Sequence, residues 1–288
     1  MTAHNGRAKL AAVLGDPISH SLSPAIHEYW LQKYGINGAY VPLKIRADKF
    51  EQSVEMLFDS GFVGFNVTLP HKERAFRFAD THDTASKICG AANTLVLQAN
   101  GNIHAMNSDA FGFVKMMEYM QQIQSFNKDY ALLLGAGGSA RAVVLALQML
   151  EVKQVVVANR TLSRAQELVA QLQPHNSHTK LVACGIDAAG EYAKEAGVII
   201  NSISVGNNAS ETIVDIVGKS SKETWIADIS YGKNGTETTR IAGQIGRNNI
   251  DGLTMLLWQA VSGFEQWFGV TPEIDAGLVK AVKEAIKI

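Results

Sequence analysis

The sequence has little cysteine, almost no net charge and no long apolar run. Its two cysteines, Cys89 and Cys184, do not form a C-x-x-C pair, which is typical of buried thiols in a reducing compartment. A net charge of −1 supplies no basic field for nucleic acid or anionic lipid. No stretch approaches the roughly 20 apolar residues that cross a membrane. The run at 10–14 ends at Gly15 and is too short for a signal-peptide core. We therefore expect a soluble cytoplasmic protein.

Several kinds of chemistry also lack support. The chain shows no metal-ligand spacing, no Ser-His-Asp order and no nucleophile elbow, so neither metal-dependent nor hydrolytic chemistry is indicated. It contains no evident repeat or low-complexity tract. With 288 residues, of which 47% are apolar and 18% charged, the chain is long enough for two globular domains, each with its own core.

Short apolar runs alternate with helical periods through the first third of the chain, which predicts a βαβ layered domain with a largely parallel sheet. The predicted strands are 10–14, 39–43, 62–67, 93–97 and 102–106, and the predicted helices are 24–34 and 47–59. A further helix runs from 108 to about 124. We assign its methionines Met116, Met117 and Met120 to the core.

A second series of strands follows, at 131–134, 155–158, 181–183, 198–201, 225–229 and 249–250. With helices between them, these six strands match a doubly wound dinucleotide-binding fold. The polar segments 173–180 and 206–211 are interpreted as surface loops. The segment 253–268 is strongly helical with one broad apolar face. Gly252, Met255 and Gln259 line up on a second face, which suits a cleft wall or a solvent-facing surface equally well.

A glycine-rich turn joins the strand 131–134 to the helix after it. Gly135, Gly137 and Ala140 fit the G-x-G-x-x-G/A pattern that opens a dinucleotide-binding unit. Gly135 permits the tight turn. Gly137 has no Cβ to block a pyrophosphate, so backbone N–H groups at the helix N-terminus can hold the anion. An ordinary strand-to-helix turn is the alternative, but the strand before, the helix after and the next strand favour cofactor binding.

The end of the second strand in this unit indicates which nicotinamide cofactor binds. An NAD site carries an acidic residue there, roughly 20 residues past the first glycine, to accept hydrogen bonds from the ribose 2′-OH. Residues 159–164 contain no carboxylate. Arg160 and Arg164 are spaced by one helical turn and can converge on one anion, whereas two cations at a helix N-terminus oppose its dipole unless an anion compensates. The pattern favours NADP over NAD.

Two segments of the first half present polar groups where an element ends. Ser21 and Ser23 offer hydroxyls at the start of a helix, which suits a substrate carboxylate, although Ser23 alone could cap that helix. The segment 66–73, Asn-Val-Thr-Leu-Pro-His-Lys-Glu, leaves an apolar strand and enters a helix. Polar residues at strand ends in such sheets face the ligand crevice, while Lys72 taken alone could be a surface lysine.

Two further polar segments, Asn93-Thr94 and Asn107-Ser108-Asp109, also lie at predicted element ends. Asp109 could simply cap the following helix. Together with the other motifs, they resemble the shikimate dehydrogenase family over nearly the whole chain. The segments that carry the resemblance are 21–24, 66–72, 92–94, 107–109, the glycine turn, 159–161, 251–253 and Gln259.

The resemblance implies an α/β fold of two domains. A substrate-binding catalytic domain at 1–108 would be completed by C-terminal helices at 250–288, and a doubly wound Rossmann NADP domain at 109–249 would be inserted between them. The implied family reaction is the reversible, NADP-linked reduction of 3-dehydroshikimate to shikimate in chorismate and aromatic amino-acid biosynthesis.

The resemblance also implies roles for individual residues. Lys72 and Asp109 would flank the reacting oxygen as an acid/base pair, with Lys72 as proton donor or acceptor. Ser21 and Ser23 would bind the carboxylate, and the ring hydroxyls would be held by Asn66, Thr68, Asn93, Tyr231 and Gln259. The cofactor residues would be Gly135, Ala136, Gly137, Gly138, Ser139, Ala140, Asn159, Arg160, Thr161, Arg164, Ser204, Ile229, Gly252 and Met255. Hydride arriving at a ketone carbon builds negative charge on oxygen, which a nearby ammonium stabilises and protonates.

The sequence departs from the family pattern at several positions. The usual N-T-D-G is Asn-Ser-Asp-Ala at 107–110, and the usual N-A-T-S is Asn-Ser-Ile-Ser at 201–204. The loop after Tyr231 lacks the proline often found there, and Thr84 stands where the family often has an acidic residue. These differences leave the substrate open, so a quinate/shikimate dehydrogenase or a paralogue acting on a related cyclic hydroxy acid is an alternative. The double serine favours shikimate.

A function of another class is a non-catalytic module that senses NADP or a pathway metabolite. The presence of Lys72, Asp109 and Gln259 disfavours it, because a sensor need not keep a proton-transfer pair. The expected partners are therefore a small-molecule substrate and NADP, with no metal, nucleic acid or membrane. Whether the protein is a monomer or a homodimer stays open.

Overall fold

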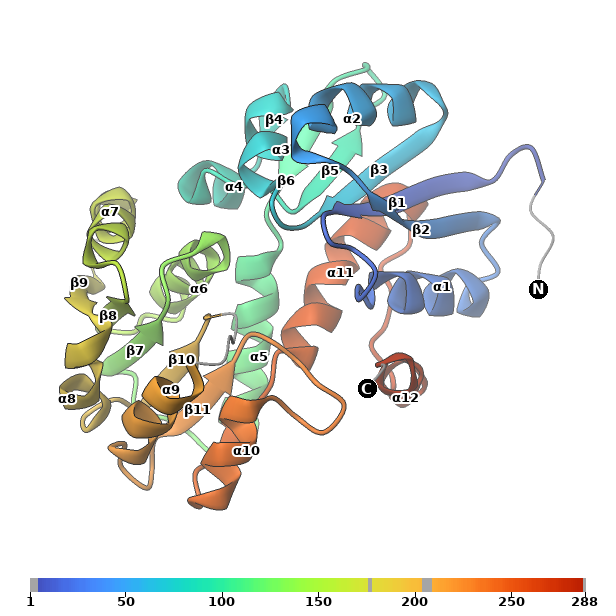
Figure 1. Ribbon diagram of the computed structural model, residues 1–288. Helices are drawn as coiled ribbons and strands as arrows, with labels where there is room; N and C mark the ends of the chain where they lie inside the picture. The colour runs from blue at the N-terminus through green and yellow to red at the C-terminus, as the bar shows by residue number, and fades with distance from the viewer. Residues whose placement is uncertain (1–4, 176–177, 204–208, 287–288) are drawn as a thin grey trace. The chain divides into compact units, whose positions relative to one another are not determined.

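Figure 1 shows the computed structural model, which describes residues 5–175, 178–203 and 209–286. The chain divides into two compact units. Unit 1 comprises the chain up to Ser108 together with the residues from Leu257 onward, and unit 2 comprises the residues from Asp109 to Leu256. The chain therefore returns to unit 1 inside helix α11 (Leu253–Phe268). The sequence predicts this return at residue 250.

Unit 1 contains a six-stranded mixed sheet with the strand order β2-β1-β3-β5-β6-β4. The strands are β1 (Lys9–Gly15), β2 (Gly38–Lys44), β3 (Phe62–Val67), β4 (Thr81–His82), β5 (Thr94–Leu97) and β6 (Ile103–Met106). β1 is parallel to β2 and β3, but β5 is antiparallel to both β3 and β6. β6 therefore runs in the same direction as β3, and β4 is parallel to β6, so only β5 is reversed. The predicted largely parallel sheet is confirmed with this one exception, because the connection 98–102 is too short for a parallel crossover.

The two faces of this sheet are covered by different helices. They are α1 (Ser23–Lys33), α2 (Phe50–Asp59) with the 3₁₀ turn Ala47–Lys49, α3 (Lys72–Phe78), α4 (Thr84–Cys89) and α12 (Ala276–Ala285), with the second half of α11. Alternate residues of β1 point to opposite faces. Ala12 and Leu14 pack with Phe50 and Phe65 in one core, and full burial of such side chains contributes roughly 1.5–3 kcal/mol each.

The opposite face of the sheet holds an aromatic cluster. His27 and Trp30 of α1, Tyr40 of β2, and Phe264 and Trp267 of α11 pack ring against ring and are all buried. β3 provides the room for one of these rings, because a Cβ at residue 64 would lie 1.9 Å from the indole nitrogen of Trp267. A glycine is therefore required at that position.

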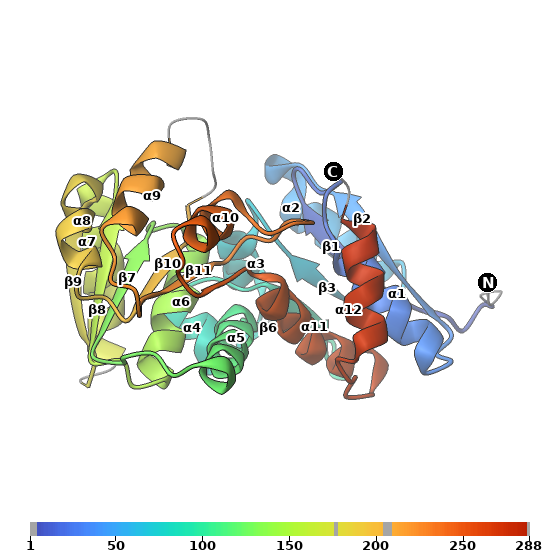
Figure 2. The same cartoon turned by 90° about the horizontal axis from the view of Figure 1, so that it is seen from below.

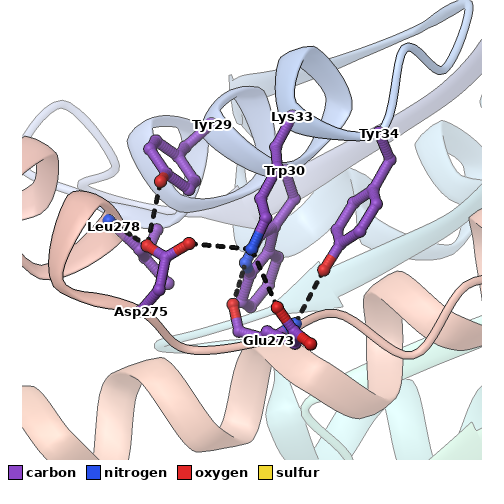
Figure 3. A network of polar contacts seen from close by, with 7 residues as sticks. All are labelled: Tyr29, Trp30, Lys33, Tyr34, Glu273, Asp275 and Leu278. Atoms are coloured by element: carbon purple, nitrogen blue, oxygen red, sulfur yellow. Dashed lines mark hydrogen bonds and ion pairs between the residues drawn. The ribbon is translucent and has the colours of Figure 1, made fainter.

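The C-terminal segment is fastened to α1 by a polar network (Figure 3). Lys33 Nζ lies 2.7 Å from Asp275 Oδ2 and 3.1 Å from Glu273 Oε2, and Tyr29 donates to Asp275 Oδ1 at 2.9 Å. These contacts, with Lys33 first, lower the pKa of Asp275 to about 2. Asp275 also caps α12, accepting from the Leu278 N–H at 2.8 Å. The network explains why α12 packs against α1 (Figure 2).

Unit 2 contains a six-stranded parallel sheet with the order β12-β11-β10-β7-β8-β9. Its strands are β7 (Tyr130–Leu134), β8 (Gln154–Asn159), β9 (Lys180–Gly185), β10 (Val198–Asn201), β11 (Trp225–Asp228) and β12 (Asn249–Ile250). Numbered within the unit, this order is 3-2-1-4-5-6, the doubly wound dinucleotide topology. The predicted Rossmann fold is confirmed.

The helices of unit 2 are α5 (Asp109–Ile123), α6 (Gly138–Met149), α7 (Leu162–Leu172), α8 (Ala189–Ala193), α9 (Ala209–Gly218), α10 (Glu237–Gln244) and the start of α11. Met116, Met117 and Met120 of α5 are fully buried, as predicted. The loop predicted at 206–211 is wrong in its second half, where α9 begins at Ala209. The segment predicted as a loop at 173–180 contains a 3₁₀ turn, Gln173–His175. None of the described helices is long and apolar enough to cross a membrane.

Candidate active site

The candidate substrate residues of unit 1 gather at one edge of its sheet. β1 and β3 end at this edge, and β5 begins there because it runs antiparallel to β3. The register pairs Asn66 with Thr94 and Thr94 with Met106. Residues 93, 107 and 108 therefore lie at the same edge, although they come from different connections.

The turn from β3 into α3 has a fixed backbone path. The carbonyl of Thr68 accepts from the His71 N–H at 2.9 Å, and the carbonyl of Lys72 accepts from the Ala92 N–H at 2.9 Å. A Cβ at Gly15 would lie 2.5 Å from the Thr68 methyl group, so the glycine at the end of β1 makes space for this turn. Lys72 is half-buried and is the first residue of α3. Its Cα therefore lies close to the sheet edge.

His71, the neighbour of Lys72, is fully buried against the ring of Phe50 at 4.9 Å between centroids. Its Nε2 lies 2.8 Å from the Ile45 carbonyl oxygen. Burial lowers the pKa of His71, so the imidazole is neutral near pH 7 and donates Nε2–H to that carbonyl. No second positive charge is therefore placed beside Lys72 in the chain.

A buried network links Asn93 to α11. Asn93 Nδ2 donates to Ser108 Oγ at 3.0 Å and to Gln259 Oε1 at 3.3 Å. Ser108 Oγ donates to the Gln259 carbonyl at 2.9 Å, and its N–H donates to Asn93 Oδ1 at 2.9 Å. Asn93 and Ser108 are 4% and 5% exposed. Ser108 thus orients the side-chain amide of Asn93 directly and holds the backbone of Gln259, whose side-chain amide is held by Asn93.

Asn66 is oriented from below by Tyr40. The tyrosine hydroxyl lies 2.6 Å from Asn66 Oδ1, while Asn66 Nδ2 faces the Asn93 carbonyl and Thr94 Oγ1, each at 3.3 Å. A carbonyl only accepts, so the amide nitrogen must be on that side and the Tyr40 hydroxyl donates to the oxygen. The ring of Tyr40 stacks on His27 at 3.9 Å and 9°. Sequence reasoning missed Tyr40 and His27, since the register of β2 places the first and the packing of α1 on the sheet places the second.

The start of α1 is not capped by Ser23. Ser23 is the first helical residue, and the N-cap position is Leu22, whose side chain makes no capping hydrogen bond. Ser21 Oγ accepts from the Ser23 N–H at 3.3 Å. Pro24 occupies the first turn, as predicted. Simple capping by Ser23 is therefore wrong, because Ser23 is not the N-cap residue. Both serines are half-buried, and the positive end of the α1 dipole lies beside them for an anion.

The glycine turn of unit 2 has the geometry that a dinucleotide requires. Gly135 has φ +107°, and a Cβ there would lie 2.5 Å from Ser202 Oγ, so no side chain fits. Among the described residues, nothing lies within 4 Å of a Cβ at Gly137 or Gly138. Ala140 is buried against the strands, and no side chain caps α6. The open backbone at the α6 N-terminus, between Ala136 and Ser139, therefore fits a pyrophosphate.

The arginines after β8 are arranged differently from the prediction. α7 begins at Leu162, so only Arg164 lies on the helix, and Arg160 precedes it. The spacing of one helical turn is wrong because the backbone of Thr161, the N-cap residue of α7, is extended. Asn159 Nδ2 donates to the Thr161 carbonyl at 2.9 Å. Both arginines are exposed. The segment still contains no carboxylate.

Three residues expected near the nicotinamide, Ile229, Gly252 and Met255, follow the last two strands of this sheet in the chain. Gly252 approaches the backbone of Ile229 so closely that a Cβ would lie 2.1 Å from its carbonyl oxygen, and the Gly252 N–H donates to the Ser230 carbonyl at 2.7 Å. Met255 is buried in the first turn of α11, and Tyr231 is half-buried in the turn after β11. Ser204 lies outside the described residues.

Asp109 is the first residue of α5 and is 3% exposed. It directly follows Ser108, whose side chain is fixed at the sheet edge of unit 1. Within the described part of the chain, no group of three or more His, Cys, Asp or Glu side chains could hold a metal ion. Cys89 and Cys184 are buried and form no disulfide with each other, as expected.

A parallel dinucleotide sheet with an open glycine turn, joined to an α/β unit with a polar sheet edge, defines a two-unit protein of the dinucleotide-binding class. Residues 13–95 match the shikimate dehydrogenase substrate binding domain, residues 118–256 the shikimate / quinate 5-dehydrogenase family, and residues 252–287 the shikimate 5′-dehydrogenase C-terminal domain. The chain belongs to the shikimate dehydrogenase family.

Named relatives agree with this assignment. The chain is 41% identical to the shikimate dehydrogenase (NADP⁺) of Jannaschia sp. over 95% of this chain and 96% of the relative. It is 29% identical to the shikimate 5-dehydrogenase of Thermus thermophilus, solved with NADP(H) and shikimate, with a TM-score of 0.78, covering 96% of this chain and all of that one. A quinate dehydrogenase of Corynebacterium glutamicum, solved with NAD, is 25% identical with a TM-score of 0.81, covering 96% and 98%.

Proposed function

We propose that this protein is an NADP-dependent shikimate dehydrogenase that reversibly reduces 3-dehydroshikimate to shikimate in the synthesis of chorismate and aromatic amino acids. The observation that carries the proposal is the sheet edge of unit 1. Lys72, Asn66, Thr68, Asn93 and Gln259 gather there on a rigid backbone, in a chain whose other unit has a dinucleotide topology.

In this proposal, Ser21 and Ser23 hold the substrate carboxylate at the N-terminus of α1, whose N-cap residue, Leu22, makes no side-chain capping bond. The amides and hydroxyls of Asn66, Thr68, Asn93, Tyr231 and Gln259 bind the ring hydroxyls. Because Asn66 and Asn93 are fixed by Tyr40 and Ser108, they are oriented before the substrate arrives.

NADPH, when bound, supplies the hydride that reaches the ketone carbon. The Lys72 ammonium stabilises the oxygen as negative charge builds there and gives it a proton, so that C=O becomes CH–OH. In the oxidative direction, neutral Lys72 takes that proton back. Asp109 orients the lysine and accepts a hydrogen bond from a substrate hydroxyl. Both residues are proposed as the acid/base pair.

Gly135, Ala136, Gly137, Gly138, Ser139 and Ala140 would hold the pyrophosphate, and Asn159, Arg160, Thr161 and Arg164 the 2′-phosphate. Ile229, Gly252 and Met255 would lie beside the nicotinamide, with Ser204 as a further cofactor contact. The fit rests on the open glycine turn and on a β8 end that carries arginine in place of a carboxylate. We propose further that the enzyme works in the cytoplasm, as a monomer or a homodimer.

The test is the absorbance of reduced nicotinamide. Purified protein is mixed with shikimate or quinate, each with NADP or NAD, and steady-state rates are measured. We expect the highest kcat/KM with shikimate and NADP. Faster turnover of quinate would favour the quinate/shikimate alternative, which the similarity to a quinate dehydrogenase supports. Binding of NADP with no turnover of any cyclic hydroxy acid would indicate the sensing module.

A further inference from the structure

The ends of β10 and β11 carry a buried polar pair that the proposed reaction does not use. Asn201 and Asp228 are the last residues of these strands, stand opposite each other in the register, and are 1% and 0% exposed. Asn201 Nδ2 donates to Asp228 Oδ2 at 3.0 Å. Burying a carboxylate costs free energy of folding unless the group is hydrogen-bonded. The hydrogen-bond partners of Asp228 therefore indicate its structural role.

Among the described residues, the donors to Asp228 are neutral, and two of them belong to the loop that carries Tyr231. Asp228 Oδ1 accepts from the Ser230 N–H at 2.8 Å, and Oδ2 accepts from Thr236 Oγ1 at 2.9 Å. One carboxylate therefore fixes both ends of the segment 229–236. In Figure 1 this segment is the loop between β11 and α10.

The network has a fixed direction. Asn201 Oδ1 accepts from the Ile203 N–H at 3.0 Å, so the Asn201 amide cannot turn over without placing its NH₂ against that N–H. Its nitrogen must therefore face Asp228, and residue 228 must accept at both oxygens. With Asp228→Asn, the new NH₂ group would face either the NH₂ of Asn201 or the N–H of Ser230, so two donors would oppose each other.

We propose that Asp228 is a positioning residue for the reaction, acting through the backbone of 229–231. By holding Ser230, it sets the place of Tyr231 and of Ile229, whose backbone contacts Gly252. The inference rests on the proposed function, since Tyr231 and Ile229 are the proposed substrate and nicotinamide neighbours. Asp228 itself is not proposed to contact the substrate or the nicotinamide.

The experiment is a charge-preserving swap. Asp228→Asn leaves two donors opposed, and Asn201→Asp places two carboxylates about 3.0 Å apart. In the double variant, Asp at 201 accepts from Ile203 and from the Asn at 228, whose oxygen accepts from Ser230. The hydroxyls of Thr236 and Thr238, which can both donate and accept, complete the network. The swap should therefore restore what each single change removes.

We expect each single variant to lower kcat/KM for shikimate roughly 10- to 100-fold, as loss of positioning does, and the double variant to recover most of it. Hydrogen exchange of the amides in 229–236 should rise in the single variants and return in the swap. Affinity for 2′,5′-ADP, which would contact only the glycine turn and the arginines, should stay unchanged. Asp275→Asn is the matched control, because Asp275 also accepts from a backbone N–H and a hydroxyl. It should leave kcat/KM unchanged.

The outcomes separate this proposal from the proposed function. Wild-type protein without turnover on shikimate would overturn the function, while the exchange measurement would still test whether Asp228 holds the loop. If Tyr231→Phe lowers kcat/KM and Asp228→Asn does not, the positioning role is wrong and the function stands. Loss of 2′,5′-ADP affinity together with activity, or no recovery in the swap, would show that the pair only stabilises unit 2 and would overturn the inference.

Discussion

Ser108 Oγ donates to the carbonyl of Gln259 at 2.9 Å, which joins the last residue before unit 2 to the helix by which the chain returns. The same serine holds the side-chain amide of Asn93, which in turn donates to the side-chain oxygen of Gln259. One residue therefore fixes Asn93 directly and the Gln259 side chain through Asn93. Ser108→Ala should raise KM for shikimate by roughly tenfold, since one buried hydrogen bond contributes about 1 kcal/mol and the unpaired groups cost more.

Steady-state kinetics of three variants would check this. Ser108→Thr keeps the hydroxyl and should restore KM to near the wild-type value. Ser86→Ala is the matched control, because Ser86 is also buried and bonds the carbonyls of Asp83 and Ala105. It should lower stability without changing KM. Equal KM values for Ser108→Ala and wild type would contradict the role of Ser108.

Lys72→Ala should lower kcat by roughly 10²- to 10⁴-fold, the usual contribution of a general acid or base, with only a modest change in KM. The lysine acts mainly on the charge that develops in the transition state. Lys49→Ala, at an exposed lysine of the same unit, should leave both constants unchanged. An unaltered kcat in Lys72→Ala would remove this residue from the mechanism.

Arg164→Ala should raise KM for NADP by roughly 10- to 100-fold, because a charged hydrogen bond to phosphate contributes about 1.5–3 kcal/mol, and should leave KM for NAD nearly unchanged. Arg160→Ala should act in the same direction. Arg77→Ala, at an exposed arginine of unit 1, serves as the control for loss of one positive charge. A parallel rise in both KM values would mean that Arg164 does not bind the 2′-phosphate.

The two glycines of the turn should respond differently to alanine. Gly135→Ala forces an alanine into φ +107° with Ser202 Oγ at 2.5 Å from its Cβ, so the folded state should lose roughly 1–3 kcal/mol or more. Gly137→Ala meets no described atom within 4 Å and should unfold like wild type, yet bind NADP more weakly if the pyrophosphate lies there. Urea unfolding and NADP titration measure the two effects separately.

Acid should destabilise unit 1 through His27. Burial lowers the pKa of His27 to about 3, while an unfolded histidine titrates near about 6.5. Below about 6.5 the unfolded chain binds a proton that the folded chain does not. The free energy of unfolding should therefore fall by up to about 1.4 kcal/mol per pH unit as the pH drops toward 3.

The measurement is urea unfolding at several pH values, followed by tryptophan fluorescence, since Trp30 and Trp267 pack near His27. His27→Phe should flatten the pH dependence, even if its stability differs from wild type at pH 7. His175→Gln, at an exposed histidine, should keep the wild-type slope. An identical slope in His27→Phe would show that other groups cause the acid sensitivity.

Local patterns predicted most of the elements, because periodicity and turn chemistry are properties of short segments. The strands and helices that carry Lys72, Gly135 and Gln259 lie close to where the sequence places them. The antiparallel β5–β6 pair was not predicted, since apolar runs of the same length suit either direction. The position of Arg160 before α7 was not predicted either, because the extended backbone of the N-cap residue Thr161 starts the helix two residues later.

The sequence alone determined the dinucleotide turn, the NADP preference and the family resemblance, since these depend on residue types at short spacing. Only the tertiary structure decided that Tyr40 holds Asn66, that Ser108 joins Asn93 to Gln259, and that Asp228 pairs with Asn201. These partners are far apart in the chain. Strand register and helix packing bring them together, and no local pattern records either.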